Sequence, residues 1–249
     1  MLLRMPAKTR SPSTVLLLVL LLAALAAWAL YSGALSVPHR WNPWAPLRID
    51  DTPNPLTRYK LARASADRDA CREALAQAGM RMAPVDDRET APGCGFDNAF
   101  RIERSDVAVG TPFTLSCRAA LSLSMWERHA LQQAAQAHLG TRVARIEHLG
   151  SYACRNRYGR KEGRRSRHAT ADALDIAGFR LEDGRRIRVL SEWQAADASG
   201  DGAGSAEAAF LRALRDGACP YFDAVLGPDY NAAHADHFHL DRGGARICR

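Results

Sequence analysis

The first 49 residues of this 249-residue chain lack acidic side chains, because Asp50 is the earliest Asp or Glu. Three cations, Arg4, Lys8 and Arg10, come before an uncharged run that extends from Val15 to Leu35. As a helix, these roughly 21 residues would be about 31 Å long, close to the roughly 30 Å hydrocarbon thickness of a bilayer. We therefore predict a transmembrane signal anchor over residues 15–35, with a cytoplasmic basic tail over residues 1–14.

A cleaved signal peptide is the alternative interpretation of the same segment. Its apolar region is normally shorter, about 7–15 residues, but small residues such as Ala24 and Ala26 leave cleavage open. Both alternatives export the rest of the chain. We expect a single-pass membrane protein whose C-terminal domain lies across the membrane from the cytoplasm, or an exported protein released after cleavage.

The six cysteines are never closer than 23 positions, so the chain has no CxxC chelate or redox pair. In an oxidising compartment they are expected to form three disulfides, for which 15 pairings exist. Cys71 with Cys94 is the simplest local pairing, because it would fasten a helix to the loop after it. Six buried free thiols are the alternative. The cysteines are Cys71, Cys94, Cys117, Cys154, Cys219 and Cys248.

The chain also lacks internal repeats, and its 47% hydrophobic and 24% charged residues exclude a wholly disordered protein. Residues 36–56 contain five prolines, a density that resists helix and strand, so we predict a linker there. Trp41 and Trp44 in this linker would lie at the membrane interface or cap the folded domain. Residues 57–249 are then the folded domain.

Hydrophobic spacing and glycines predict the elements of that domain. Helices are expected at residues 56–79, 119–139 and 206–216, the second ended by Gly140 and the third by Gly217. Residues 84–95 are expected to be a loop. Strands are expected at residues 143–152, 173–179, 186–190 and 238–241, with a hairpin turn at 182–184. No βαβ rhythm connects them, so the predicted class is α+β.

A basic loop, residues 155–167, carries seven cations and one acid, Glu162, and so supplies most of the net charge of +7. No nucleic-acid-binding motif accompanies this run, and an exported domain rarely meets nucleic acid, so we expect no nucleic-acid partner. Attraction to an anionic polymer such as a cell wall fits better. A solvated loop without a partner is the alternative. The oligomeric state is not predictable from these features.

Histidines and carboxylates gather in two segments. Three of the eight histidines lie in the last sixteen residues, where His237 and His239 would share one face of a strand. His168 lies shortly before Asp175, and a turn between them would bring both side chains to one point. Two neutral imidazoles and one carboxylate leave a fourth position open on tetrahedral zinc, which is typical of a catalytic site.

Three motifs carry a resemblance to a known family. They are Gly150-Ser-Tyr-Ala-Cys-Arg-Asn-Arg157, Ala173-Leu-Asp-Ile-Ala-Gly-Phe179 and the stretch from Gly227 to Asp241. With them, residues 58–249 resemble the bacterial extensin-like C-terminal domain family. Its motifs are similar to those of zinc D-alanyl-D-alanine carboxypeptidases, murein endopeptidases and hedgehog domains, which begin Ser-x-His-x-x-Gly-x-Ala-x-Asp. Ser166 starts this pattern here, and Ala171 replaces its glycine.

The resemblance implies a hedgehog-like or DD-peptidase-like antiparallel sheet with flanking helices, and Zn²⁺ as the cofactor. It makes His168, Asp175 and His239 the zinc ligands. The general base is then His237, as in the endopeptidase branch, or Asp236, as in the carboxypeptidase branch. His234 would orient substrate or stabilise a developing oxyanion. Arg155, Arg157 and Ser166 are assigned to substrate binding, the arginines as anchors for a substrate carboxylate.

The function expected from these features is zinc-dependent hydrolysis of amide bonds in peptidoglycan peptides, by an endopeptidase or a carboxypeptidase. The alternative is a non-catalytic module that binds the cell wall and retains zinc for stability, because hedgehog-like relatives keep such a site without that activity. A metal nuclease would be favoured by the positive charge alone. For a bacterial member of this family, the N-terminal helix implies a single-pass protein of the inner membrane with its C-terminal domain in the periplasm, or a protein secreted to the periplasm after cleavage. The expected partners are then the inner membrane, through that helix, and peptidoglycan or another anionic cell-wall polymer.

Overall fold

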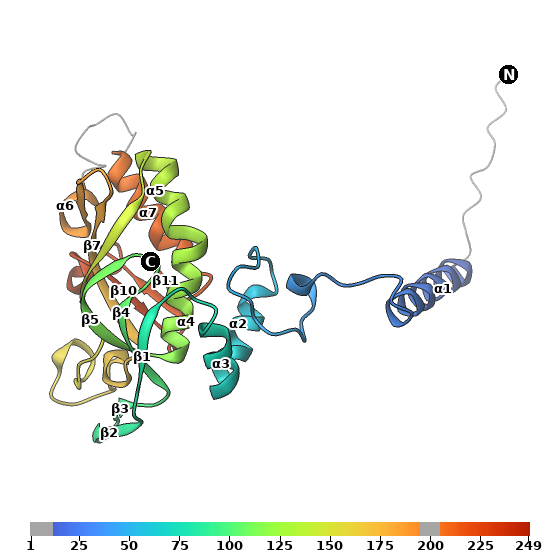
Figure 1. The fold of residues 1–249 in the computed structure, drawn as a ribbon, viewed down its shortest axis with the longest axis horizontal. Coiled ribbons are helices and arrows are strands. Elements are labelled where there is room, and N and C mark those ends of the chain that lie inside the picture. The colour runs from blue at the N-terminus through green and yellow to red at the C-terminus, as the bar shows by residue number, and fades with distance from the viewer. Residues whose placement is uncertain (1–11, 195–204) are drawn as a thin grey trace.

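A computed structural model describes residues 12–194 and 205–249, and Figure 1 shows their arrangement. The predicted α+β class is confirmed: helices pack on a large, mostly antiparallel sheet. The helices are α1 (Pro12–Tyr31), α2 (Thr57–Ala66), α3 (Arg68–Leu75), α4 (Cys117–Trp126), α5 (Gln132–Leu139), α6 (Val189–Glu192) and α7 (Ala206–Ala218). A π-helical turn, Glu127–Leu131, joins α4 to α5.

Within the described residues the sheet has nine strands in the order β1-β4-β5-β6-β7-β10-β9-β11, with β8 paired to β7. The strands are β1 (Arg81–Val85), β4 (Ala99–Arg104), β5 (Ala108–Ser116), β6 (Val143–Gly150), β7 (Ala173–Leu181), β8 (Arg186–Arg188), β9 (Ala224–Leu226), β10 (Phe238–Asp241) and β11 (Ile247–Cys248). A separate two-stranded sheet contains β2 (Arg88–Ala91) and β3 (Cys94–Phe96).

The helices α4, α5 and α7 cover one face of the large sheet (Figure 1). Their apolar sides and the inward residues of the central strands form the core, in which Trp126, Phe179 and Phe210 stack edge to face or tilted. The predicted helix over 119–139 is confirmed as the continuous α4–α5 rod. It ends at Gly140, which adopts a left-handed φ of 67°.

Two local predictions were wrong. Residues 84–95 are not a loop, because β1 extends to Val85 along β4, and β2 and β3 pair with each other. Gly217 does not stop its helix, since α7 continues to Ala218. The reason for this glycine is close packing: a Cβ atom at position 217 would lie 2.8 Å from the Cβ of Ala130. Strand boundaries also differ, because β6 ends at Gly150 and the residues after Arg188 turn into α6.

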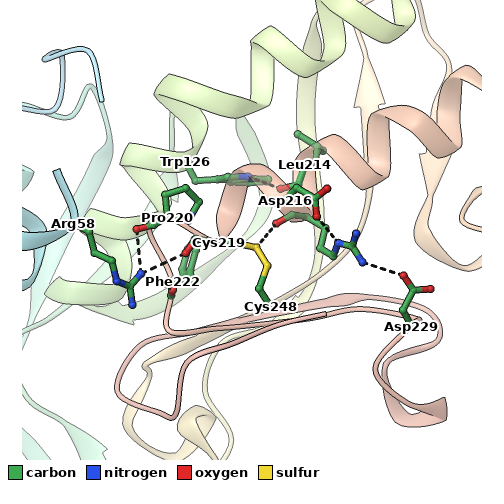
Figure 2. The surroundings of a disulfide bond; sticks show 10 residues. Arg58, Trp126, Leu214, Asp216, Cys219, Pro220, Phe222, Asp229 and Cys248 are labelled. Atoms are coloured by element: carbon green, nitrogen blue, oxygen red, sulfur yellow. Dashed lines mark hydrogen bonds and ion pairs between the residues drawn. A yellow bond between two sulfur atoms is a disulfide. The ribbon is translucent and has the colours of Figure 1, made fainter. Parts of the chain in front are cut away.

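The chain forms three disulfides, as predicted, but the expected Cys71–Cys94 pair is wrong. Cys71 pairs with Cys117 because α3 packs against the start of α4, and Cys94 pairs with Cys154 at the base of the basic loop. Cys219–Cys248 ties the end of α7 to β11, where Arg58 donates to the carbonyls of Cys219, Pro220 and Phe222 (Figure 2). Packing between segments that are far apart in the sequence therefore determines which cysteines pair.

The N-terminal segments differ in how they meet the domain. Helix α1 is apolar, with a mean hydropathy of 2.5 and no burial within the structure, which is compatible with a membrane anchor or a signal sequence. The proline-rich segment after it is largely irregular, apart from a 3₁₀ turn at His39–Trp41. It does not stand apart from the domain, because Leu47 and Ile49 are buried in the main core.

Candidate metal centre

The centre is built on two neighbouring strands whose side chains alternate between faces. Leu174 and Ile176 on β7, with Phe238 and Leu240 on β10, point into the helix-covered core. Asp175 and His239, at the intervening positions, therefore lie on the opposite face. They are also direct antiparallel partners in the register of β7 with β10. The period of two and this register bring the carboxylate and the imidazole together.

His168 reaches the same point from a 3₁₀ turn, Arg167–Thr170, that precedes β7. Ser166 caps this turn by accepting from the His168 backbone N–H at 3.4 Å. Ala171 ends it in a left-handed conformation with φ of 53°. The Ser-x-His-x-x-Gly-x-Ala-x-Asp pattern has glycine at this position, and left-handed backbone is the conformation that glycine adopts without steric cost. The alanine keeps the turn despite that cost.

Hydrogen bonds orient both imidazole rings. Nδ1 of His168 lies 3.2 Å from the carbonyl oxygen of Ser151, which can only accept, so this nitrogen carries the proton. Its Nε2 then faces Asp175 Oδ2 at 3.1 Å. Nε2 of His239 lies 3.1 Å from Asp241 Oδ2, and its Nδ1 faces Asp175 Oδ1 at 2.8 Å. Each ring thus turns one nitrogen toward the centre and binds the protein with the other.

The three donor atoms form a compact set. Nε2 of His168 and Nδ1 of His239 lie 3.2 Å apart, and all three donors lie within 4.8 Å of one another. Ligands bound to tetrahedral zinc at roughly 2.1 Å would be separated by about 3.4 Å. The spacing and the nitrogen and oxygen chemistry of His168, Asp175 and His239 therefore fit one zinc-sized ion, with small adjustments.

Charge supports this arrangement. Burial alone would raise the pKa of Asp175, but hydrogen bonds from His168 and His239 outweigh it and lower the pKa well below its usual range. Burial would lower the pKa of His239, whereas hydrogen bonds to Asp175 and Asp241 raise it to about 9. A divalent cation bound here would compete with the proton that Asp175 and Asp241 stabilise on His239.

Asp241 belongs to the centre, although sequence reasoning gave it no role. It is buried, and one oxygen accepts from His239 while the other has no hydrogen-bond partner among the described residues. The sequence did contain a signal for this role, because Asp241 follows His239 by two residues in a predicted strand, and such residues share one face of the strand. Carboxylates that bind the far nitrogen of a ligand histidine fix its tautomer and orientation.

A cavity of about 380 Å³ opens onto this centre. Arg155, Arg157 and Ser166, assigned to substrate binding from the sequence, all line it. So do His234 and His237, along with two residues that were not predicted, Tyr158 and Tyr230. Asp236 is not among the lining residues, and more than half of its side chain is exposed. The structure thus brings together every predicted site residue at the cavity wall except Asp236, which does not line the cavity but binds the ring of His237, which does.

Asp236 and His237 form a dyad. Asp236 Oδ1 accepts from His237 Nδ1 at 2.7 Å, so the other ring nitrogen, Nε2, is the one that faces the cavity. That Nε2 lies 3.7 Å from Asp175 Oδ1. The two residues that competed for the role of base therefore have different positions. His237 reaches the centre, and Asp236 holds its ring.

A chain of hydrogen bonds orients His234. The backbone N–H of Ala233 donates to Asn231 Oδ1, which identifies that atom as the amide oxygen. His234 Nδ1 lies 2.8 Å from the same oxygen and so donates to it. Burial and the nearby His239 and His237 lower the pKa of His234 to about 4. The neutral ring therefore offers Nε2 as a hydrogen-bond acceptor.

The basic loop is folded back on itself. Asn156 and Arg165 form an isolated β-bridge, and the Asn156 amide donates to the carbonyls of Arg160 and Lys161 at 3.0 Å each. Arg165 also binds the carbonyl of Pro92, close to the Cys94–Cys154 disulfide. The loop is therefore tethered, and three of its seven cations, Arg155, Arg157 and Arg167, line the cavity.

The sequence profile of the family described as Extensin-like protein C-terminus matches residues 69–249. This match includes His168, Asp175 and His239, together with the basic loop and the strands that carry the centre. No curated protein and no solved structure matches the chain.

Proposed function

The chain belongs to the extensin-like protein C-terminus family, and from its donor set we propose a zinc-dependent hydrolase that cleaves amide bonds in peptidoglycan peptides. The observation that carries the proposal is the convergence of His168, Asp175 and His239 at the wall of an open cavity. Three protein ligands with one open side are the donor pattern of catalytic rather than structural zinc sites.

When bound, zinc would supply Lewis acidity, which polarises a carbonyl group and lowers the pKa of a water molecule. Asp175 holds negative charge at the centre, since hydrogen bonding keeps it ionised. Ser151 and Asp241 fix the tautomers of the two ligand histidines from behind. The ligand atoms are thus aimed at one point before any ion or substrate arrives.

His237 is the proposed general base. Its Nε2 faces the cavity, and Asp236 accepts from its Nδ1 at 2.7 Å, so the ring is held in the tautomer that takes a proton at Nε2. The same nitrogen can then pass that proton to the leaving amine. Asp236 acts through His237 in this scheme, which distinguishes the two candidates that the sequence left open.

The cavity wall suits a peptide that carries negative charge. Arg155 and Arg157 line it and can anchor a substrate carboxylate through paired N–H groups. His234 offers Nε2 as an acceptor, so it is placed to bind a substrate N–H rather than to stabilise an oxyanion. Stem peptides of peptidoglycan present both carboxylates and amide N–H groups, and the cations of the basic loop would concentrate such a polymer near the site.

Location and fold are parts of the same proposal. Helix α1 would act as an uncleaved anchor in the inner membrane, with the disulfide-bonded domain in the periplasm. The antiparallel sheet with helices on one face would be of the hedgehog and DD-peptidase type. The two motifs support that likeness, because they place the donor residues on the neighbouring antiparallel strands β7 and β10 and on the turn before β7.

Digestion of purified sacculi by the full chain tests the proposal. We expect soluble peptide fragments that disappear with a chelator and return with added zinc, and mass spectrometry of the fragments would identify the bond cut. Absence of zinc-dependent products would overturn the hydrolase. If the protein bound zinc and sacculi but released nothing, the result would support the non-catalytic wall-binding module instead.

A further inference from the structure

Two tryptophans between α1 and α2 point into solvent. The side chain of Trp44 is 81% exposed and that of Trp41 is 45% exposed. Only a few residues later, Leu47 and Ile49 are buried in the main core. The same short segment therefore inserts its aliphatic side chains into the domain and turns its aromatic ones away. Trp44, the more exposed of the two, does not cap the domain.

The domain holds this segment by its backbone. The guanidinium of Arg63 donates to the three consecutive carbonyls of residues 43–45, at 2.7 to 2.9 Å. The ammonium group of Lys60, which is 2% exposed, donates to the carbonyl of His39 at 3.0 Å. The His39 ring binds Asp51 in turn, at 2.8 Å. Contacts from α2 thus hold in place the backbone that carries the two tryptophans.

The apolar helix ends very near this segment. After Tyr31 the chain folds back on the last turn of α1: the N–H of Ser32 donates to the carbonyl of Trp28, and that of Leu35 donates to the carbonyl of Ala29. Four residues then lead from Leu35 to His39, which spans about 14 Å at full extension. The fixed segment therefore begins within about 14 Å of Leu35, whose N–H is hydrogen-bonded to the last turn of α1.

We propose that residues 38–48 form an aromatic foot that docks on the bilayer surface and holds the folded domain against the membrane. Trp41 and Trp44 would lie at the boundary between headgroups and acyl chains, which tryptophan favours because its ring is apolar and its N–H is polar. Arg40 and Arg48, both exposed, would face anionic headgroups. The inference rests on the anchor part of the proposed function.

Orientation of the domain follows from this docking. In Figure 1 the segment before α2 lies to the right of the sheet and helices of the domain, and the basic loop, drawn in yellow, lies at their lower left. A domain that docks through the aromatic foot would turn the basic loop away from the bilayer. The cations of that loop would then face a polymer layer beyond the membrane rather than lipid.

Quenching of tryptophan fluorescence tests the foot on the full chain. The protein would be reconstituted into vesicles of phosphatidylethanolamine and phosphatidylglycerol whose acyl chains carry bromine just below the headgroups. Trp28→Phe serves as the background, because Trp28 lies in α1. Trp126 and Trp193 are 1% and 3% exposed and lie in the protein core, out of contact with lipid. Trp41 and Trp44 are then the residues that bromine can reach.

We expect clear quenching in this background, loss of that quenching in Trp41→Phe/Trp44→Phe, and retention of it in the matched control Trp193→Phe. Quenching that is absent, or unchanged without Trp41 and Trp44, would overturn the foot. Flotation of the same vesicles tests the anchor separately from the foot. If the protein floats with the vesicles but shows no quenching, the anchor is supported and the foot is overturned. If the protein does not float, both proposals are overturned.

Discussion

Asp175 on β7 and His239 on β10 are direct cross-strand partners, and Asp175 Oδ1 lies 2.8 Å from His239 Nδ1. A shift of the register by one residue would turn His239 into the helix-covered core and place Phe238 or Leu240 on the open face. Burial of Phe238 and Leu240 therefore stabilises the strand register on which the geometry of the metal centre depends. Core packing and donor placement depend on the same strand pairing.

Replacement of Asp241 tests whether a carboxylate behind His239 tunes metal binding. We expect Asp241→Asn to lower zinc affinity about 10–100-fold, because the variant loses the charge that orients and polarises the ring. Competition with a fluorescent chelator would measure the affinity. Asp183→Asn, at an exposed hairpin turn, is the control and should bind zinc like the parent. Equal affinity in both variants would contradict the role of Asp241.

Activity measurements distinguish His237 from Asp236. His237→Ala is expected to lower the rate of peptide release by about 10²–10⁴-fold, the usual range for loss of a general base. Asp236→Asn should cost less, since the ring of His237 remains in place. Both variants should keep stoichiometric zinc, which elemental analysis would confirm. His138→Ala, at an exposed position in α5, controls for removal of a histidine, and a larger loss in Asp236→Asn than in His237→Ala would reverse the assignment.

Stability should fall with rising pH because of one buried carboxyl. Burial raises the pKa of Glu127 from 4.5 to about 8, although hydrogen bonds from Ser105 and the N–H of Asp106 oppose the rise. The folded protein therefore holds a proton that the unfolded chain releases above about pH 4.5. The contribution of Glu127 is fully present below that pH and is lost progressively up to about pH 8, at up to about 1.4 kcal/mol per pH unit.

Glu127→Gln isolates this effect, because an amide keeps the shape of the neutral carboxyl and can still bind Ser105. We expect the variant to equal the parent near pH 4.5 and to gain relative stability up to about pH 8, as measured by urea unfolding. Glu182→Gln changes an exposed residue and should show no such divergence. A constant difference across the pH range would show that Glu127 is ionised in the folded protein.

Gly217 gives a test of close helix packing. An alanine at this position would bring a Cβ to 2.8 Å from Ala130, so Gly217→Ala should lower the free energy of unfolding by about 1–3 kcal/mol despite the higher helix propensity of alanine. Gly79→Ala is the matched control, since a Cβ there meets nothing within 4 Å. Equal stability of the two variants would mean that α7 and the π-helical turn can separate easily.

The disulfide between Cys94 and Cys154 should stabilise both the fold and the basic loop. Its removal in Cys94→Ser/Cys154→Ser opens a loop of 60 residues, for which chain entropy predicts a loss of about 4 kcal/mol. Thermal unfolding would measure this loss. Peptide mapping without reduction should recover Cys71–Cys117, Cys94–Cys154 and Cys219–Cys248, and a Cys71–Cys94 peptide would contradict the structure.

Patterns with a fixed local period could be predicted from the sequence. The helix over 119–139, its end at Gly140 and the strand over 238–241 all appear, because 3.6-residue and two-residue spacing record which face is buried. Strands β1 to β5 were missed. Their alternation is interrupted by bulges between Arg81 and Met82 and between Ile102 and Arg104, so the period is lost at short range.

By itself the sequence determined that the chain has an apolar N-terminal helix, six widely spaced cysteines, an α+β pattern and two histidine-containing motifs. The tertiary structure alone decided which cysteines pair, why α7 needs Gly217, and that Asp236 stands behind His237 while Asp241 stands behind His239. The physical reason is range. Periodicity and composition act between neighbours along the chain, whereas pairing, close contact and ring orientation depend on groups that only packing brings within a few ångströms.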